Sequence, residues 1–146
     1  MTYYAKIVVM NQEQLKDLIQ TATHVRKYAH APYSHFPVGA AVLDEHGNIH
    51  NGCNVENAAY PSGSCAEEQA IGSMVASGGK KIKAIVVTGI SDAPITPCGA
   101  CRQRIREFAD SDTQIYICHV EEGVQKIFTI DELLPYSFGP DNLKGL

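Results

Sequence analysis

The chain has 146 residues, of which 45% are apolar and 19% charged, and its formal net charge is −4. This length suits a single domain, and this composition excludes a disordered chain. No apolar run approaches the ~20 residues of a membrane-spanning helix, and there is no basic stripe for a phosphate backbone. Without a recognisable signal peptide, we expect a cytoplasmic protein that acts on a small molecule and has no membrane or nucleic-acid partner.

Helices and strands alternate through the chain, as judged from apolar periodicity, β-branched runs and breakers. Asn11 can cap the first helix, and Pro97 stands where the first position of the third helix is expected. In chain order the segments are 11–28 (helix), 38–43 and 49–55 (a hairpin), 64–77 (helix), 82–88 (central strand), 96–108 (helix), 115–120 and 124–128 (strands) and 131–134 (short helix). This order predicts one α/β domain, with a mixed sheet covered by helices.

The chain has an odd number of cysteines and no secretory signal, which argues against a disulfide scaffold and favours metal binding or catalysis. They are Cys53, Cys65, Cys98, Cys101 and Cys118.

Two short segments carry the candidate chemistry, and each begins a predicted helix: Cys65-Ala66-Glu67 and Pro97-Cys98-Gly99-Ala100-Cys101. A thiol at a helix N-terminus meets free backbone N–H groups and the positive end of the helix dipole, which favour the thiolate. Two such helix starts side by side would present three thiolates to one Zn²⁺ ion and leave its fourth place open for catalysis. Glu67 is close enough in sequence to reach a water on that metal and to transfer its proton.

Other interpretations of these residues stay open at this point. The Cys98-x-x-Cys101 pair could be a redox pair, or half of a structural zinc site completed by Cys53 or Cys118. Ser64 to Glu67 also fits a capping box, in which glutamate at the third helical position bonds back to the cap.

The chain resembles the small, homotetrameric cytidine deaminases that act on free nucleosides. The matching segments run in the family's order, from about residue 11 to the C-terminus, so residues 1–10 are interpreted as an extension and 11–146 as a single deaminase domain. The segments are Tyr33-Ser34-His35-Phe36-Pro37-Val38-Gly39-Ala40-Ala41, Gly52-Cys53-Asn54-Val55-Glu56-Asn57-Ala58-Ala59-Tyr60-Pro61, Cys65-Ala66-Glu67, Pro97-Cys98-Gly99-Ala100-Cys101-Arg102-Gln103 and Leu133-Leu134-Pro135-Tyr136-Ser137-Phe138-Gly139-Pro140.

The resemblance implies a three-layer α/β/α fold with a five-stranded mixed sheet. It also implies one Zn²⁺ per subunit and hydrolytic deamination of cytidine and 2′-deoxycytidine in pyrimidine salvage. The implied zinc ligands are Cys65, Cys98 and Cys101, and Glu67 is the implied catalytic residue. The implied substrate contacts are Asn54 and Glu56 at the sugar hydroxyls, Phe36 at the base, the backbone of Ala66 together with Glu67 at the edge of the pyrimidine, Tyr60 at a subunit contact, and Phe138 in a neighbouring subunit's site.

One position departs from the family pattern. Many members carry arginine directly after the catalytic glutamate, where it is thought to offset the charge of three thiolates, whereas this chain has Glu68. Either Glu68 points away, or the helix N-termini suffice, or another cation such as Arg102 compensates. We expect the pH profile to differ from that of relatives with arginine.

Three rival functions remain. The first is deamination of a modified cytosine such as blasticidin S, whose enzymes share the zinc motifs. The second is a polynucleotide editor, which the acidic net charge disfavours. The third is a non-catalytic structural zinc module with a closed set of four ligands.

Overall fold

The computed structural model describes residues 10–145, and the nine residues before them, which make up most of the proposed extension, lie outside that range. Met10, the last residue of that extension, packs against the core beside α1. The elements are α1 (Gln12–Arg26), β1 (Gly39–Asp44), β2 (Ile49–Cys53), η2 (Tyr60–Ser62), α2 (Ala66–Ala76), β3 (Ile82–Gly89), α3 (Gly99–Phe108), β4 (Ala109–His119), β5 (Gly123–Thr129), α4 (Ile130–Leu133) and η3 (Pro140–Leu143).

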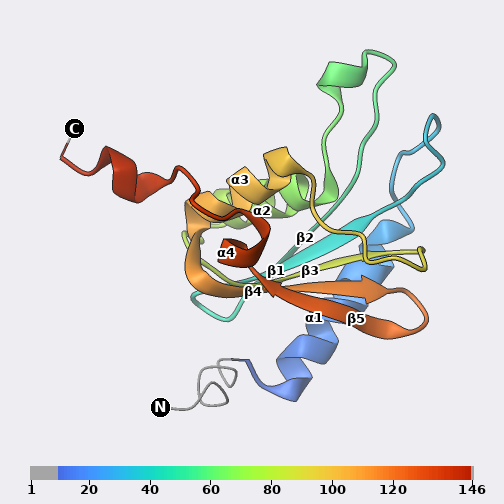
Figure 1. Ribbon diagram of the computed structural model, residues 1–146. Coiled ribbons are helices and arrows are strands. Elements are labelled where there is room, and N and C mark those ends of the chain that lie inside the picture. The colour runs from blue at the N-terminus through green and yellow to red at the C-terminus, as the bar shows by residue number, and fades with distance from the viewer. Residues whose placement is uncertain (1–9, 146) are drawn as a thin grey trace.

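Five strands form one sheet in the order β2-β1-β3-β4-β5, with β3 in the centre as expected. The pair β3 and β4 is parallel and every other pair is antiparallel, so the sheet is mixed. Figure 1 shows α1 on one face of the sheet and α2, α3 and α4 on the other. The predicted three-layer α/β/α architecture is therefore confirmed.

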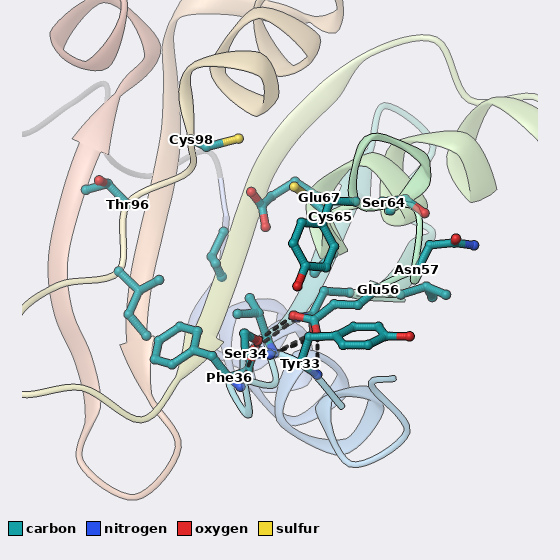
Figure 2. A pocket seen from close by; sticks show the side chains of 18 residues that line it. Tyr33, Ser34, Phe36, Glu56, Asn57, Ser64, Cys65, Glu67, Thr96 and Cys98 are labelled. Atoms are coloured by element: carbon teal, nitrogen blue, oxygen red, sulfur yellow. Dashed lines mark hydrogen bonds between the residues drawn. The ribbon is translucent and has the colours of Figure 1, made fainter. Parts of the chain in front are cut away.

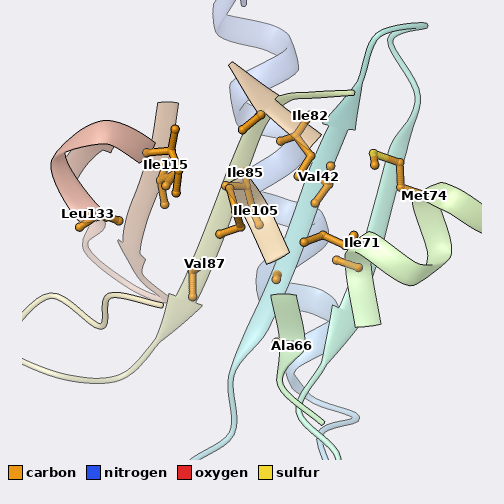
Figure 3. Close-up of a cluster of buried hydrophobic side chains, with 14 of the residues drawn as sticks. Val42, Ala66, Ile71, Met74, Ile82, Ile85, Val87, Ile105, Ile115 and Leu133 are labelled. Atoms are coloured by element: carbon orange, nitrogen blue, oxygen red, sulfur yellow. The ribbon is translucent and has the colours of Figure 1, made fainter. Parts of the chain in front are cut away.

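A separate apolar cluster fills each interface of the sheet. The larger one lies between the sheet and α2, α3 and α4, and includes Val42, Ile71, Ile85 and Ile105 (Figure 3). The smaller one, which includes Leu18, packs α1 against the other face. The central strand faces both clusters, which explains why β3 is an almost continuous run of apolar residues.

Close packing of α2 on β2 requires glycine at position 52. A Cβ atom added to Gly52 would lie 2.5 Å from the backbone nitrogen of Ala70, so only glycine allows the helix this near the strand. The end of the helix follows the sequence-based expectation, because Gly78 has a left-handed φ of +93° after the C-cap Ser77.

Several predicted boundaries were wrong by two residues or more. Helix α3 begins at Gly99, and Pro97 precedes its N-cap Cys98 instead of occupying the first helical position. Strand β4 begins at Ala109, six residues before the expected start, because pairing with β3 overrides the polar composition of that stretch. Strand β2 ends at Cys53, two residues before the expected end, and beyond it the backbone carbonyl of Asn54 accepts from the N–H of His30 and not from a strand.

Candidate metal and active site

The sulfur atoms of Cys65, Cys98 and Cys101 lie within 4.8 Å of one another, and we refer to these residues as the thiol cluster. Cys65 is the N-cap of α2 and Cys98 is the N-cap of α3, while Cys101 lies in the first turn of α3. The two helix starts therefore meet, as the sequence predicted. Among residues 10–145, neither Cys53 nor Cys118 belongs to this group, so the alternative of a four-cysteine site is wrong.

The thiol cluster fits a zinc ion. Three thiolates at ~2.3 Å from one tetrahedral ion would be separated by about 3.8 Å, a spacing that small adjustments of these side chains produce. Burial and the adjacent charge of Glu67 raise the pKa of Cys101, so a stable thiolate there requires a cation. Burial opposes ionisation at Cys98 as well, but the backbone N–H of Cys101 and the neighbouring thiols lower its pKa.

Glu67 lies in the first turn of α2 and is only 5% exposed. Burial is the main reason why the pKa of this carboxyl is raised. The capping-box interpretation is wrong, because Cys65 is the N-cap and no side chain caps this helix. Instead of capping the helix, Ser64 accepts a hydrogen bond from the Gln69 side chain at 2.8 Å.

The thiol cluster and Glu67 lie at one end of a cavity of about 670 Å³ (Figure 2). Cys65, Cys98 and Glu67 line this cavity, whereas Cys101 is buried behind it. The cavity lies near the C-terminal end of β3, where Val87 contributes to the wall. Crevices at this end of parallel strands are frequent ligand sites in α/β proteins.

Asn54 and Glu56 also line the cavity, although neither belongs to a strand. Short bridges hold their segment in place, since Val55 pairs with His30 on one side and with Ser64 on the other. The amide of Asn54 accepts a hydrogen bond from the backbone N–H of Val38 at 2.8 Å and donates to the carbonyl of Phe36 at 2.9 Å. Asn54 therefore lies beyond β2 and not within the strand predicted over 49–55, but both side chains reach the cavity.

The carboxylate of Glu56 accepts three hydrogen bonds from the loop that carries Phe36. The backbone N–H groups of Tyr33 and Ser34 donate at 3.0 and 3.1 Å, and the Ser34 hydroxyl donates as well. These bonds, those from Ser34 above all, lower the pKa of Glu56. The hydroxyl of Ser34 also accepts from the backbone N–H of Phe36 at 3.1 Å, so Glu56 organises one wall of the cavity.

The structure brings all but one of the other candidate residues to the cavity. Phe36 and Ala66 contribute to its wall, and Tyr60 lines it while remaining 76% exposed. Phe138 does not line the cavity of its own chain and is 58% exposed. It lies on the segment that follows α4, and the end of that segment, with η3, projects from the body of the domain (Figure 1).

Glu68 points toward α3, where a carboxylate oxygen lies 3.6 Å from Nη2 of Arg104. It does not line the cavity. Glu68 therefore points away from the metal site, which was the first of the three possibilities raised from the sequence. The charge of Arg104 also lowers the pKa of Glu67, although less than burial raises it.

Sequence reasoning missed several cavity residues, among them Ser34, Asn57, Ile95 and Thr96. Ser34 stood inside a motif, yet nothing in the motif indicated that its hydroxyl would contact a residue 22 positions away. Ile95 and Thr96 lie on a long connection after β3. Their position three and two residues before Cys98 was the only sequence feature that could have placed them at the cavity.

Residues 12–117 match the family described as the cytidine and deoxycytidylate deaminase zinc-binding region. The match covers well over half of the chain, and this chain therefore belongs to that family of zinc-binding deaminases.

Individual relatives agree with this assignment. The cytidine deaminase of Sporosarcina psychrophila is 40% identical over 129 residues, which is 88% of this chain and 94% of the relative. A probable cytidine deaminase of Dictyostelium discoideum is 42% identical over 135 residues, or 92% and 90% of the two chains. Among solved structures, the cytidine deaminase from Burkholderia pseudomallei superimposes with a TM-score of 0.80 at 38% identity, covering 88% of this chain and all of the other.

These similarities confirm the resemblance inferred from the motifs and do not favour deamination of blasticidin S. Within residues 10–145, no helix combines the length and apolar character that crossing a membrane requires.

Proposed function

We propose that the protein is a zinc-dependent enzyme that hydrolyses cytidine and 2′-deoxycytidine to the corresponding uridines and ammonia. The observation that carries the proposal is the meeting of the thiol cluster with the buried carboxylate of Glu67 at one end of a single cavity. A general acid and base beside an open metal position is the arrangement that hydrolytic removal of an amino group needs.

Cys65, Cys98 and Cys101 would hold the zinc ion, which when bound would make a water molecule nucleophilic near neutral pH. Glu67 would take one proton from the attacking water and deliver it to N3 of the base while the water oxygen bonds to C4. Glu67 would then move the remaining proton of the new C4 hydroxyl to the amino nitrogen, so that the bond from C4 to nitrogen breaks, ammonia leaves and a C4 carbonyl forms. Burial suits Glu67 to this task, because a raised pKa brings the carboxyl closer to the pH at which it must both accept and donate a proton.

The rest of the cavity binds the nucleoside in this proposal. Phe36 packs against the base. The backbone of Ala66 and the carboxylate of Glu67 form hydrogen bonds with the edge of the pyrimidine ring. Asn54 and Glu56 face the sugar hydroxyls. Three intramolecular donors already occupy the Glu56 carboxylate, which leaves about one acceptor position for a sugar hydroxyl.

The charge of the cavity favours a nucleoside over its monophosphate. Among residues 10–145, those that line it include Glu56 and Glu67, which carry carboxylates, but no lysine, arginine or histidine. Recognition of a phosphate ordinarily uses cationic side chains or a helix N-terminus, and both helix starts here face the thiol cluster. A phosphate-free substrate therefore fits this chain, although the family description also includes deoxycytidylate deaminases.

We further propose that the active form is a homotetramer in which Phe138 enters a neighbouring subunit's cavity and Tyr60 lies at the contact between subunits. Their exposure, together with the projecting C-terminal segment, supports this arrangement. The extension formed by residues 1–10, the cytoplasmic location and a role in pyrimidine salvage remain predictions from the sequence.

The test is ultraviolet absorbance of cytidine, 2′-deoxycytidine and deoxycytidine monophosphate incubated with protein that contains one zinc ion per chain. We expect the two nucleosides to lose the cytosine absorbance and the monophosphate to react far more slowly. No reaction with either nucleoside would refute the proposal, and an equally fast reaction with the monophosphate would refute its account of the cavity charge.

A further inference from the structure

Of the three zinc ligands, Cys98 has the weakest local support. Cys101 is buried within α3, and Cys65 follows the bridge between Val55 and Ser64. Cys98, in contrast, is exposed and follows a connection of irregular backbone that begins after β3. No side chain caps the helix that Cys98 begins. Something other than the helix cap must hold this residue at the thiol cluster.

The guanidinium of Arg102, one helical turn after Cys98, folds back over this connection. Nε donates to the carbonyl of Pro97 at 2.7 Å, and Nη2 donates to the hydroxyl of Thr96 at 3.0 Å. Nη1 donates to the carbonyl of Leu133 at the end of α4 at 2.8 Å. One partly buried side chain thus joins the two residues directly before Cys98 to a second helix.

We infer that Arg102 is a positioning residue that holds Cys98 in place for zinc binding. Its hydrogen bonds act on Cys98 through Thr96 and Pro97, and the contact with Leu133 anchors the guanidinium to the body of the domain. Thr96 also lines the cavity, so the same bonds fix part of the substrate-facing wall. This inference rests on the proposed function, because it assigns Arg102 a role in the metal site of that reaction.

The geometry of these bonds predicts that lysine cannot replace Arg102. A guanidinium presents five donors in a rigid plane, and three of them here reach acceptors on two separate segments. A lysine ammonium keeps the positive charge, but its three N–H donors share one nitrogen at the end of a flexible stem, so it cannot reach all three acceptors.

Zinc affinity tests the inference without any substrate. We would measure the zinc dissociation constant of the full chain by competition with a chromophoric chelator, for the parent, R102A, R102K and T96V. Loss of an outer partner of a metal ligand typically weakens metal binding roughly 10- to 100-fold. We expect a weakening of this size for R102A, a smaller one for R102K, and the smallest for T96V, which removes one acceptor.

Arg106 provides a matched control on the same helix. It is partly buried and donates to the Ser137 hydroxyl at 2.9 Å, but it contacts neither Thr96 nor Pro97. R106A should therefore leave the zinc dissociation constant within about twofold of the parent value. A merely structural role for Arg102 would lower the stability of the zinc-free chain in R102A and R106A alike, and would give both the same zinc affinity.

An unchanged zinc dissociation constant in R102A, or equal weakening in R106A, would overturn the inference. So would full zinc affinity in R102K, since charge alone would then suffice. If R102A does not fold, R102K and T96V still decide, because parental zinc affinity in both would exclude positioning by these bonds. Failure of the parent itself to bind zinc would refute the proposed function instead.

Discussion

The hydroxyl of Ser34 donates a hydrogen bond to the carboxylate of Glu56, although the two residues are 22 positions apart in the chain. This contact joins the loop that carries Phe36 to the segment that faces the sugar. It holds the Glu56 carboxylate in one position as a hydrogen-bond acceptor. This wall of the cavity therefore needs little rearrangement when a nucleoside binds.

Removal of the Ser34 hydroxyl should weaken substrate binding more than it slows the reaction. S34A leaves Glu56 with two backbone donors, and a net loss of ~0.5–1.5 kcal/mol corresponds to a KM raised roughly 2- to 10-fold. The check is steady-state kinetics with cytidine. S73A, which removes an exposed hydroxyl on α2 outside the cavity, is the control and should match the parent. A fall in kcat with KM unchanged would contradict this role for Ser34.

Loss of the Glu67 carboxylate should abolish most of the catalysis and leave the metal site intact. A positioned general acid and base contributes about 10²- to 10⁴-fold, so E67Q should lose at least that much in kcat. Zinc content is measured on the same sample and should stay at one ion per chain, because the thiol cluster is unchanged. Near-normal turnover in E67Q would show that another group moves the protons.

Complementation between two inactive variants tests whether Phe138 serves a neighbouring subunit. F138A keeps Glu67, and E67Q keeps Phe138, so mixed oligomers contain some sites that have both. We expect coexpressed chains to exceed the summed activities of the separate variants. The control replaces E67Q by the double variant E67Q/F138A, which has no Phe138 to donate and should restore nothing. Equal activity in both mixtures would argue against shared sites.

The buried pair of Asp44 and His50 should make stability depend on pH in the acid range. Their side chains lie 2.7 Å apart, and Asp44 also accepts from the backbone N–H groups of His46 and Asn48. Although burial opposes ionisation, these bonds hold the pKa of Asp44 below its ordinary 3.8. The stabilisation is therefore complete above that ordinary value and is lost as the pH falls through the lowered pKa.

D44N should accordingly lower the free energy of unfolding at neutral pH by about 1–3 kcal/mol, the cost of disrupting buried hydrogen bonds. The gap to the parent should shrink as the pH falls below 3.8. Chemical denaturation at several pH values measures both effects. D110N, which removes an exposed ion pair with Lys81, is the control and should change stability by less than about 1 kcal/mol. A gap that stays constant down to low pH would exclude a contribution from ionised Asp44.

Neutralising Glu68 should have little effect on catalysis. Its carboxylate faces Arg104 outside the cavity, and an exposed ion pair is worth about 0–1 kcal/mol. We expect E68Q to have the same pH profile of activity as the parent and a free energy of unfolding within about 1 kcal/mol of the parent value. A displaced profile in E68Q would show instead that this charge acts on the metal site.

The sequence by itself determined the features that depend on neighbouring residues. Apolar periodicity located the helices and strands, and the positions of Cys65 and Cys98 before helical segments identified the thiol cluster. Glu67 was singled out for the same reason, since it lies two positions after Cys65 and the local helix fixes where its side chain points. The ends of helices and strands were predicted less accurately, as at the start of β4, where the residues are mostly polar.

Only the tertiary structure decided the contacts between segments that are distant in sequence. It placed Glu68 against Arg104, bound Glu56 to Ser34, and joined Arg102 to Leu133 at the end of another helix. Such pairs follow from strand register, loop closure and helix packing, which arise when the whole core assembles. A motif can mark which residues matter, but the partner of a side chain is set by the fold that surrounds it.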